Sequence, residues 1–417
     1  MLVKYRDSIT LTIRKLPLST NQSLAHSRPI LTAIALSLGA AVSLGLARFS
    51  YALLLPVMRD DLSWPYLLAG AINTGNAFGY FVGALLTPAI MRRAGAQTTL
   101  IFGTVVTGVF LIACGFTTET NNLMVLRVLA GIASALIFVA GGVLAARLGT
   151  LHMDRAGLLI GLYYGGTGLG IFLSSLLVPL ALTFAHAHGY VHTWQPAWIA
   201  LGLLSLITTA IIIRPIRGID GHVAPQSVHA KFRSRPYLFG LSAYFMFGAG
   251  YIGYMTFIIA LLKEQGMATT SITIFYSMLG LSSVLAARIW AGMLDKYKGG
   301  ESMAILCALL CVATVLPLLS SWFVLVFVSG ILFGGAFLSV VASTTALVRH
   351  NSAPTAWSSG IGMFTTVFAL GQIAGPTMVG WISDHFGGLR IGLGCSALIL
   401  IVGAALATQQ KPLQHGH

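Results

Sequence analysis

Long runs of apolar residues recur along this chain and are separated by short polar breaks. An α-helix rises about 1.5 Å per residue, so about 20 apolar residues cross the roughly 30 Å hydrocarbon core of a bilayer. Twelve such stretches occur, at 30–57, 66–90, 98–117, 122–148, 156–184, 194–214, 237–262, 270–294, 302–319, 322–348, 355–383 and 389–408. The runs are continuous, whereas the strands of a membrane barrel would alternate apolar and polar residues. The pattern therefore predicts an all-α membrane protein with 12 transmembrane helices.

The positions of the charges indicate how these helices are oriented. Hydrophobic residues make up 56% of the 417 residues and charged residues only 8%, yet the formal net charge is +14. If the N-terminus is placed inside, the cytoplasmic segments carry 18 of the 24 Lys and Arg, and the opposite side carries only Arg59, Lys263 and Arg390. This asymmetry follows the positive-inside rule. It predicts a multi-pass protein of the bacterial inner membrane with both termini in the cytoplasm, and it favours the lipid bilayer over nucleic acid as the partner of these charges.

The chain offers no signature of a signal peptide, a disulfide framework or a metal site. Residues 1–29 contain no apolar core followed by a small-residue cleavage site, so we expect the first span to act as its own insertion signal. Three histidines cluster at 186–192 without a nearby acid or cysteine, which favours an exposed polar loop over a metal site. The cysteines all fall in apolar stretches, where we expect them to pack: Cys114, Cys307, Cys311 and Cys395.

A polar segment near the middle divides the twelve spans six and six. The expected organisation is a cytoplasmic N-terminal segment (1–29), a six-helix bundle (30–214), a cytoplasmic linker (215–236), a second six-helix bundle (237–408) and a cytoplasmic tail (409–417). Glycine-containing segments repeat between the halves, at 83–86 and 292–295 and again at 166–170 and 371–375, with an offset of roughly 205–209 residues. Duplicated six-helix halves are a transporter architecture, with the substrate site at the interface of the repeats near the midplane.

Four motifs resemble those of the major facilitator superfamily. They are Gly292-Met-Leu-Asp295-Lys296 after the eighth span, Arg127-x-x-x-Gly131-x-x-x-Ala135 in the fourth, Gly371-Gln372-x-x-Gly375-Pro376 in the eleventh, and the stretch from Gly45 to Met58 in the first. The last of these resembles the poorly characterised YbfB/YjiJ-type branch. The loop motif after the second span departs from the superfamily pattern, since Pro88 stands about where an acid belongs. The resemblance implies the major facilitator fold and transport by alternating access, without naming a substrate.

The resemblance also implies conformational or structural roles for a set of residues. These are Arg127, Gly131, Gly292, Asp295, Gly375 and Pro376.

Two arginines within spans are the leading candidates for substrate contact. Arg48 lies nine residues before the end of the first span, too deep for its side chain to reach water easily. A guanidinium in this position faces a partner or a wet cavity, and its planar fork matches a carboxylate. Arg288 in the eighth span resembles the arginine that contacts the substrate carboxylate in monocarboxylate transporters, although Val284 replaces their preceding acid. The alternatives are a structural Arg48 bonded to helix-end carbonyls and a gating Arg288 paired with loop carboxylates.

Polar and aromatic side chains within other spans complete the predicted substrate site. We expect contributions from Tyr51, Asn73, Asn76, Tyr251 and Gln372. Asn73 and Asn76 share a helix face at i and i+3, and Tyr251 belongs to an aromatic stripe on the seventh span. Links between helices and packing are the alternatives for these residues. If the stripe lines the cavity, the substrate has an apolar or aromatic body.

These features together predict a secondary or facilitative transporter for a small organic anion, with a carboxylate favoured. All ten Asp and Glu fall in loops or at span ends, so the embedded arginines have no embedded acid beside them. The alternatives are an efflux carrier for amphipathic or drug-like compounds and a transporter-like receptor. No nucleophile–His–acid set, phosphate loop or cofactor motif occurs, so we expect neither enzymatic activity nor a cofactor, and we expect a monomer. Without an embedded titratable group, facilitated diffusion or anion exchange is favoured over proton coupling.

Overall fold

The structure is a computed structural model that describes residues 24–219 and 232–413. Most of the predicted N-terminal segment, the middle of the predicted linker and the end of the predicted tail lie outside the described residues. The described part is helical and contains no strand. It therefore has the all-α class that the sequence predicts.

Eleven helices of the described residues are long and apolar enough to cross a bilayer, and one of them contains two spans. α4 (Tyr66–Cys114) has 49 residues and is interrupted at Gly95, where φ is 79° and ψ is 158°. Glycine adopts this backbone conformation readily because it has no Cβ to clash. The chain turns here between its second and third spans. When α4 is divided into two spans at this turn, the described residues form 12 spans. The predicted fold class is confirmed.

The helices follow the order of the apolar stretches. The first half consists of α2 (Pro29–Ala40), a π-helical segment (Ala41–Phe49), α3 (Tyr51–Asp61), α4, α5 (Thr120–Leu151), α6 (Ala156–Ala187) and α7 (Gln195–Ile216). The second half consists of α8 (Leu238–Glu264), α9 (Thr269–Lys296), α10 (Glu301–Leu319), α11 (Phe323–Asn351), α12 (Trp357–His385) and α13 (Leu389–Thr408). The short helices are α1 (Leu24–Ser27) and the 3-10 turns Met153–Arg155, Arg235–Tyr237 and Pro354–Ala356.

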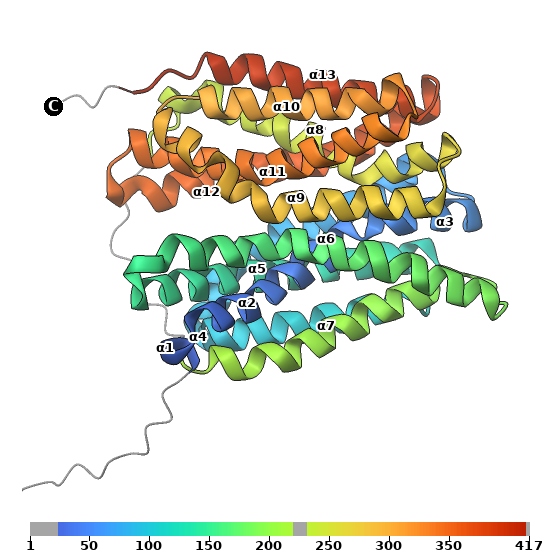
Figure 1. Ribbon diagram of the computed structural model, residues 1–417, viewed down its shortest axis with the longest axis horizontal. Coiled ribbons are helices and arrows are strands. Elements are labelled where there is room, and N and C mark those ends of the chain that lie inside the picture. Colours follow the sequence, from blue (N-terminus) through green and yellow to red (C-terminus); the bar gives the residue numbers. More distant parts are fainter. Residues whose placement is uncertain (1–23, 220–231, 414–417) are drawn as a thin grey trace, which may run out of the picture.

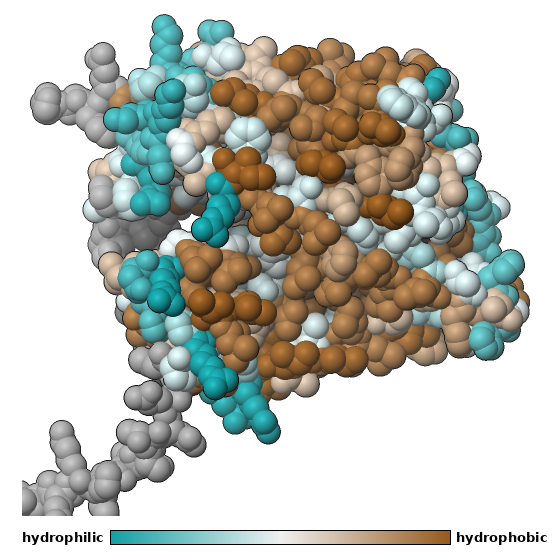
Figure 2. Space-filling model, in the orientation of Figure 1, coloured by the Kyte–Doolittle hydropathy of each residue, from teal (hydrophilic) through white to brown (hydrophobic). Residues whose placement is uncertain are grey.

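The outer surface carries an apolar belt between two hydrophilic ends (Figure 2). Large apolar side chains within the spans point outward, among them Leu180 at 68% exposure and Leu398 at 62%. Exposing apolar surface to water costs about 25 cal/mol per Å², so a belt of this kind is stable only when lipid covers it. The chain is an integral, multi-pass membrane protein.

The two halves pack internally and lie side by side with their helices along a common axis (Figure 1). In the first half α4 packs on α5 and α7, and in the second half α8 packs on α12 and α13 while α9 packs on α11. The described chain begins and ends at the same end of the molecule, which we call the terminal end (Figure 1). The opposite end, with the turns near Trp64, His188 and Gly266, is called the far end.

The halves touch along the part of the molecule nearer the far end. α4 packs on α12, α6 on α9 and α3 on α8. A Cβ on Gly165 of α6 would meet Val284 of α9 at 3.7 Å. Gly161 lies one turn nearer the terminal end and Gly157 two turns nearer, and a Cβ atom added at either position would meet nothing within 4 Å. The contact between α6 and α9 therefore ends at Gly165, and the halves separate toward the terminal end.

The far end is closed by a carboxylate of one half that caps a helix of the other. The backbone N–H groups of Tyr66 and Leu67, at the start of α4, donate to Asp384 of α12 at 2.9 and 2.7 Å. These N–H groups have no partner within their own helix, and a negative charge complements the helix dipole at this point. The Tyr66 hydroxyl also donates to Glu264 of α8, and the Arg59 guanidinium lies 3.9 Å from the centre of the Tyr66 ring.

Candidate functional site

The first span departs from α-helical geometry where it carries Arg48. Residues Ala41–Phe49 form a π-helix, and the Ser50 N–H donates to the Gly45 carbonyl five residues earlier at 3.0 Å. Segments of this type are rare and often mark functional positions. Gly45 packs directly on the backbone of Gly170 in α6, where no Cβ would fit. The widened turn and this close approach hold Arg48 at the interface between the halves.

Arg48 is buried without a counter-ion. Its side chain is 2% exposed, and its Nε and Nη2 atoms are buried without a hydrogen-bond partner. The guanidinium lies 5.7 Å from the centre of the Tyr80 ring in α4, and it is close enough to Tyr251 in α8 to interact electrostatically. Tyr80 belongs to the first half and Tyr251 to the second, so Arg48 faces both halves. A cation–π contact is worth about 0.5–2 kcal/mol and offsets only part of the cost of burying a charge.

Arg127 is also buried, but it belongs to the core of the first half. Its Nη1 donates to the carbonyl of Ala47 at 2.6 Å, whereas its Nε and Nη2, like those of Arg48, are buried without a hydrogen-bond partner. Its guanidinium lies 5.2 Å from the centre of the Tyr51 ring and 5.0 Å from that of Trp198. These contacts tie α5 to the π-helical segment next to Arg48. Such a position suits a structural role for Arg127, and its charge adds to the positive potential around Arg48.

The predicted polar residues of α3 and α4 have partners in the protein. The Tyr51 hydroxyl donates to the Ala69 carbonyl at 2.8 Å, within the first half. Asn76 Nδ2 donates to the Arg127 carbonyl at 3.1 Å. Asn73 Nδ2 donates across the interface to Thr256 of α8 at 2.7 Å. The Oδ1 atoms of both asparagines are buried and accept no hydrogen bond, so each side chain keeps a free acceptor.

The aromatic stripe of α8 lies beside Arg48 as part of a larger stack. The Gln372 side chain in α12 donates to the Tyr251 hydroxyl, so these two predicted residues are joined. The stack is formed by near-parallel rings from α8, α11 and α12, namely Tyr244, Phe247, Tyr251, Phe337 and Phe368. Phe49, next to Arg48, meets Phe337 edge-on with centroids 6.0 Å apart. The stack thus reaches the first half at the π-helical segment.

The structure does not bring Arg288 to Arg48. Its side chain is exposed, one helical turn beyond Val284 and therefore where α6 and α9 separate. Asp295 is exposed in the last turn of the same helix, and the space beside Gly292 is open. The sequence expectation that Arg288 contacts substrate stays a prediction, as does its alternative as a gating residue.

The remaining predicted residues lie at close helix contacts. A Cβ on Gly131 would meet the backbone of Asn76 and Tyr80, so α5 lies directly against α4. A Cβ on Gly375 would meet Ile252 of α8 at 2.6 Å. The Pro376 carbonyl lies against Gly70, at the contact between α12 and α4. These positions let helices approach closely both within and between the halves.

Sequence reasoning missed several residues of this site. Tyr80 was not among the predicted substrate residues, although it lies one turn beyond Asn76 on the same face of α4, a spacing that could have identified it. Phe368 carries no sequence signal beyond apolarity, and Phe49 belongs to the Gly45–Met58 motif without a predicted role of its own, because the stacking partners of both are distant in the chain. Asp384 could be recognised only as an acid at a span end, since its contact with α4 crosses 318 positions.

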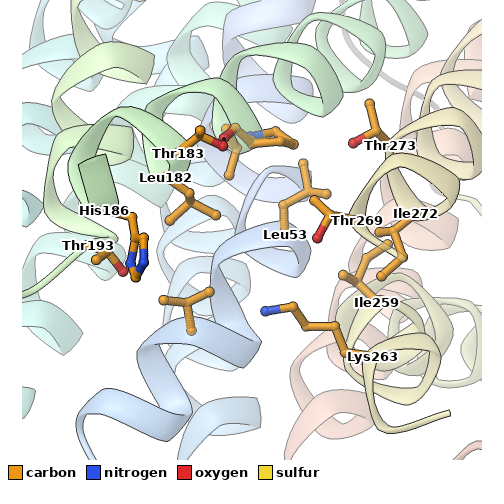
Figure 3. Close-up of a pocket in the computed structure, with 13 residues that line it drawn as sticks. Leu53, Leu182, Thr183, His186, Thr193, Ile259, Lys263, Thr269, Ile272 and Thr273 are labelled. Carbon is orange, nitrogen blue, oxygen red and sulfur yellow. Dashed lines mark hydrogen bonds between the residues drawn. The ribbon is translucent and has the colours of Figure 1, made fainter. Parts of the chain in front are cut away.

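A pocket of about 320 Å³ lies apart from Arg48, near the far end between α3, α6, α8 and α9. Lys263 and His186 point into it from opposite sides, between apolar residues and threonines (Figure 3). No predicted substrate residue lines it. Among the described residues, no group of three or more His, Cys, Asp or Glu is placed to hold a metal ion. The unpartnered charge at the interface, and not this pocket, therefore defines the candidate site.

The fold, with its two packed halves and interfacial cation, is that of a membrane transporter, and sequence comparison identifies the class. Residues 40–408 match the family model described as "Uncharacterised MFS-type transporter YbfB". The protein is a transporter of the major facilitator superfamily, which is a class of transporters and not of enzymes. Within that superfamily, the chain belongs to the YbfB-type family, as the sequence motifs predict.

Three proteins that resemble this chain have low sequence identity to it. A protein of Agrobacterium vitis named as a candidate tartrate transporter is 23% identical over 392 residues, covering 83% of this chain and 85% of the relative. A bacterial homologue of the human lysosomal transporter Spinster matches with a TM-score of 0.70 at 14% identity, over 92% of this chain and 97% of that one. The nucleoside transporter NupG matches with a TM-score of 0.70 at 13% identity, over 91% and 97%. These solved structures show a shared fold.

Proposed function

We propose that the protein carries a small organic anion, a carboxylate, across the inner membrane by alternating access and binds it at Arg48. One observation carries this proposal: Arg48 is buried between residues of both halves, and its guanidinium makes no hydrogen bond within the described residues, whereas Arg127 makes one and has its contacts within the first half. On insertion scales a buried arginine costs about 2.5–3.5 kcal/mol. A bound carboxylate would accept hydrogen bonds from the planar fork and supply the missing counter-charge.

The charge distribution around the site supports an anion over a cation. Arg48 and Arg127 are close enough for their charges to interact, and every described acid lies at a helix end or in a loop. The interior of the first half therefore has a positive potential. At low effective dielectric this potential attracts an anion and repels a cation more strongly than it would in water. Tartrate is a dicarboxylate, so the relative named as a tartrate transporter adds support for a carboxylate substrate.

The arrangement of the two halves supports alternating access. In this conformation the halves are in contact near the far end and separate toward the terminal end, which we assign to the cytoplasm from the distribution of basic residues. Opening the far end requires release of Asp384 from the start of α4. Closing the terminal end would bring α6 toward α9 near Arg288, where this residue can act as a second contact or as a gate.

Efflux of amphipathic compounds is the second candidate. The stacked aromatic rings beside Arg48 favour this second candidate, because an aromatic surface can bind many different planar apolar compounds. The two proposals differ in the charge of the ligand that the site accepts.

A thermal-shift screen of the purified protein separates these proposals. Carboxylates are expected to raise the Tm of the wild-type protein and of Arg92→Ala, a matched control that removes an exposed basic residue at the terminal end. They are expected to leave the Tm of Arg48→Ala unchanged and to raise that of Arg48→Lys only slightly, because lysine keeps the charge but lacks the planar guanidinium that binds both carboxylate oxygens. Stabilisation by amphipathic cations that persists in Arg48→Ala would support the efflux alternative. A full carboxylate response in Arg48→Ala would refute the anion site.

A further inference from the structure

Among the described residues, Arg48 is the buried arginine that has contacts in both halves. Arg127 also has two unpartnered nitrogens, but its contacts, with the Ala47 carbonyl and the rings of Tyr51 and Trp198, all lie within the first half. Arg288 is exposed on α9, away from the rings that enclose Arg48. A ligand with a single carboxylate is therefore matched by the site, whereas the second carboxylate of a dianion would be buried without a counter-ion, at a cost of several kcal/mol.

The other polar groups of the site are neutral and include both acceptors and donors. Asn73 and Asn76 use their Nδ2 groups within the protein, and their Oδ1 atoms remain unpartnered. The Tyr251 hydroxyl accepts a hydrogen bond from Gln372, so its own O–H remains free to donate. An amide oxygen repels a carboxylate but accepts a hydrogen bond from a hydroxyl group. These groups supply no second positive charge and are compatible with a neutral hydroxyl on the ligand.

The rest of the wall is a set of aromatic planes with a common orientation. The rings of Tyr251 and Phe368 have centroids 5.6 Å apart and an interplanar angle of 15°. Tyr251 and Phe337 are 6.1 Å apart at 14°. Phe368 is the member of the stack that is only partly buried, whereas the other four are buried. A flat ring can add to such a stack in an offset arrangement, which is favourable beyond the burial of its area.

We propose that the preferred substrate is an aromatic monocarboxylate, with its carboxylate on Arg48 and its ring against Phe368 and Tyr251. This inference rests on the proposed function and narrows it. It departs from the dicarboxylate suggested by the relative named for tartrate, because Arg48 is the buried arginine among the described residues with contacts in both halves, and the neutral groups beside it cannot balance a second negative charge.

The test compares benzoate, cyclohexanecarboxylate and tartrate as ligands of the purified full-length protein by calorimetry. Benzoate and cyclohexanecarboxylate have the same charge and nearly the same size, so their difference reports ring stacking. Benzoate is expected to bind the wild-type protein roughly two- to twelve-fold more tightly than cyclohexanecarboxylate, the range that corresponds to an aromatic pair. Tartrate is expected to show no binding at the same concentrations.

Phe368→Leu is expected to remove the preference for benzoate over cyclohexanecarboxylate, because leucine keeps an apolar contact but offers no ring for stacking. Phe116→Leu, at a ring that is 74% exposed near the far end, is the matched control and should retain the preference. Tartrate binding that depends on Arg48, without benzoate binding, would overturn this inference and leave the proposed function intact. Equal affinities for benzoate and cyclohexanecarboxylate would also overturn it. Carboxylate binding that survives Arg48→Ala would refute the proposed function itself.

Discussion

Replacing Arg48 by methionine should stabilise the ligand-free protein. Methionine is unbranched and apolar, so Arg48→Met removes the charge and fills much of the same space. Burial of the arginine costs about 2.5–3.5 kcal/mol on insertion scales. The cation–π contact of its guanidinium with the Tyr80 ring, at 5.7 Å, offsets about 0.5–2 kcal/mol of this cost. The expected gain in the free energy of unfolding is therefore about 2 kcal/mol.

Arg127→Met is the matched comparison, since Arg127 is equally buried. Its bond to the Ala47 carbonyl is worth about 1.5–3 kcal/mol and its two ring contacts about 0.5–2 kcal/mol each, although its Nε and Nη2, like those of Arg48, have no hydrogen-bond partner. These contributions offset the cost of burial, so removal of Arg127 should leave stability unchanged or reduce it. The two arginines are thus expected to respond in different ways to the same substitution.

Scanning fluorimetry in detergent measures both variants without ligand. Arg48→Met is expected to raise the Tm by about 2–4 °C, and Arg127→Met is expected not to raise it. A fall in the Tm of Arg48→Met that exceeds the fall in Arg127→Met would refute the reasoning. It would show that the Arg48 guanidinium is satisfied within the fold, which would leave it unavailable to a substrate.

Three further predictions concern the gate, the coupling and the topology. Asp384→Asn should weaken the two hydrogen bonds that cap α4 and open the far end. Electron double resonance should then give a longer distance between spin labels on the far-end turns of α5 and α10. An unchanged distance distribution would contradict a gating role for Asp384. In proteoliposomes with substrate on both sides, an imposed pH gradient should drive no accumulation beyond that of the weak acid itself; accumulation lost in Asp295→Asn would establish proton coupling instead. Alkaline phosphatase fused after His188 should be active and after His222 inactive, and the reverse pattern would refute the orientation.

The fold was predictable because bilayer thickness constrains helix length directly. A stretch such as 322–348 must be a spanning helix by length and composition, and the structure has one at Phe323–Asn351. The turn at Gly95 between the second and third spans was also expected, from the polar and basic residues around it. The π-helical geometry of Ala41–Phe49 was not, because it depends on packing of Gly45 against a helix more than a hundred residues away.

The candidate site was predictable only in part. Arg48 could be identified because a charge deep in an apolar span is costly wherever it lies. Its partners could not be, because the contacts with Tyr80 and Tyr251 depend on how the two halves meet. The same limit applies to Arg288. Its motif predicts substrate contact, yet whether it approaches Arg48 depends on the closure of α6 against α9.

Substrate counterflow tests the central claim, that Arg48 binds the transported carboxylate, most directly. Proteoliposomes are loaded with the unlabelled carboxylate that binds best in the thermal-shift screen, and uptake of the same labelled compound is followed. The account predicts rapid counterflow for the wild-type protein and for Arg92→Ala, a severe loss for Arg48→Lys and none above empty liposomes for Arg48→Ala. Counterflow by Arg48→Ala at the wild-type rate would contradict it.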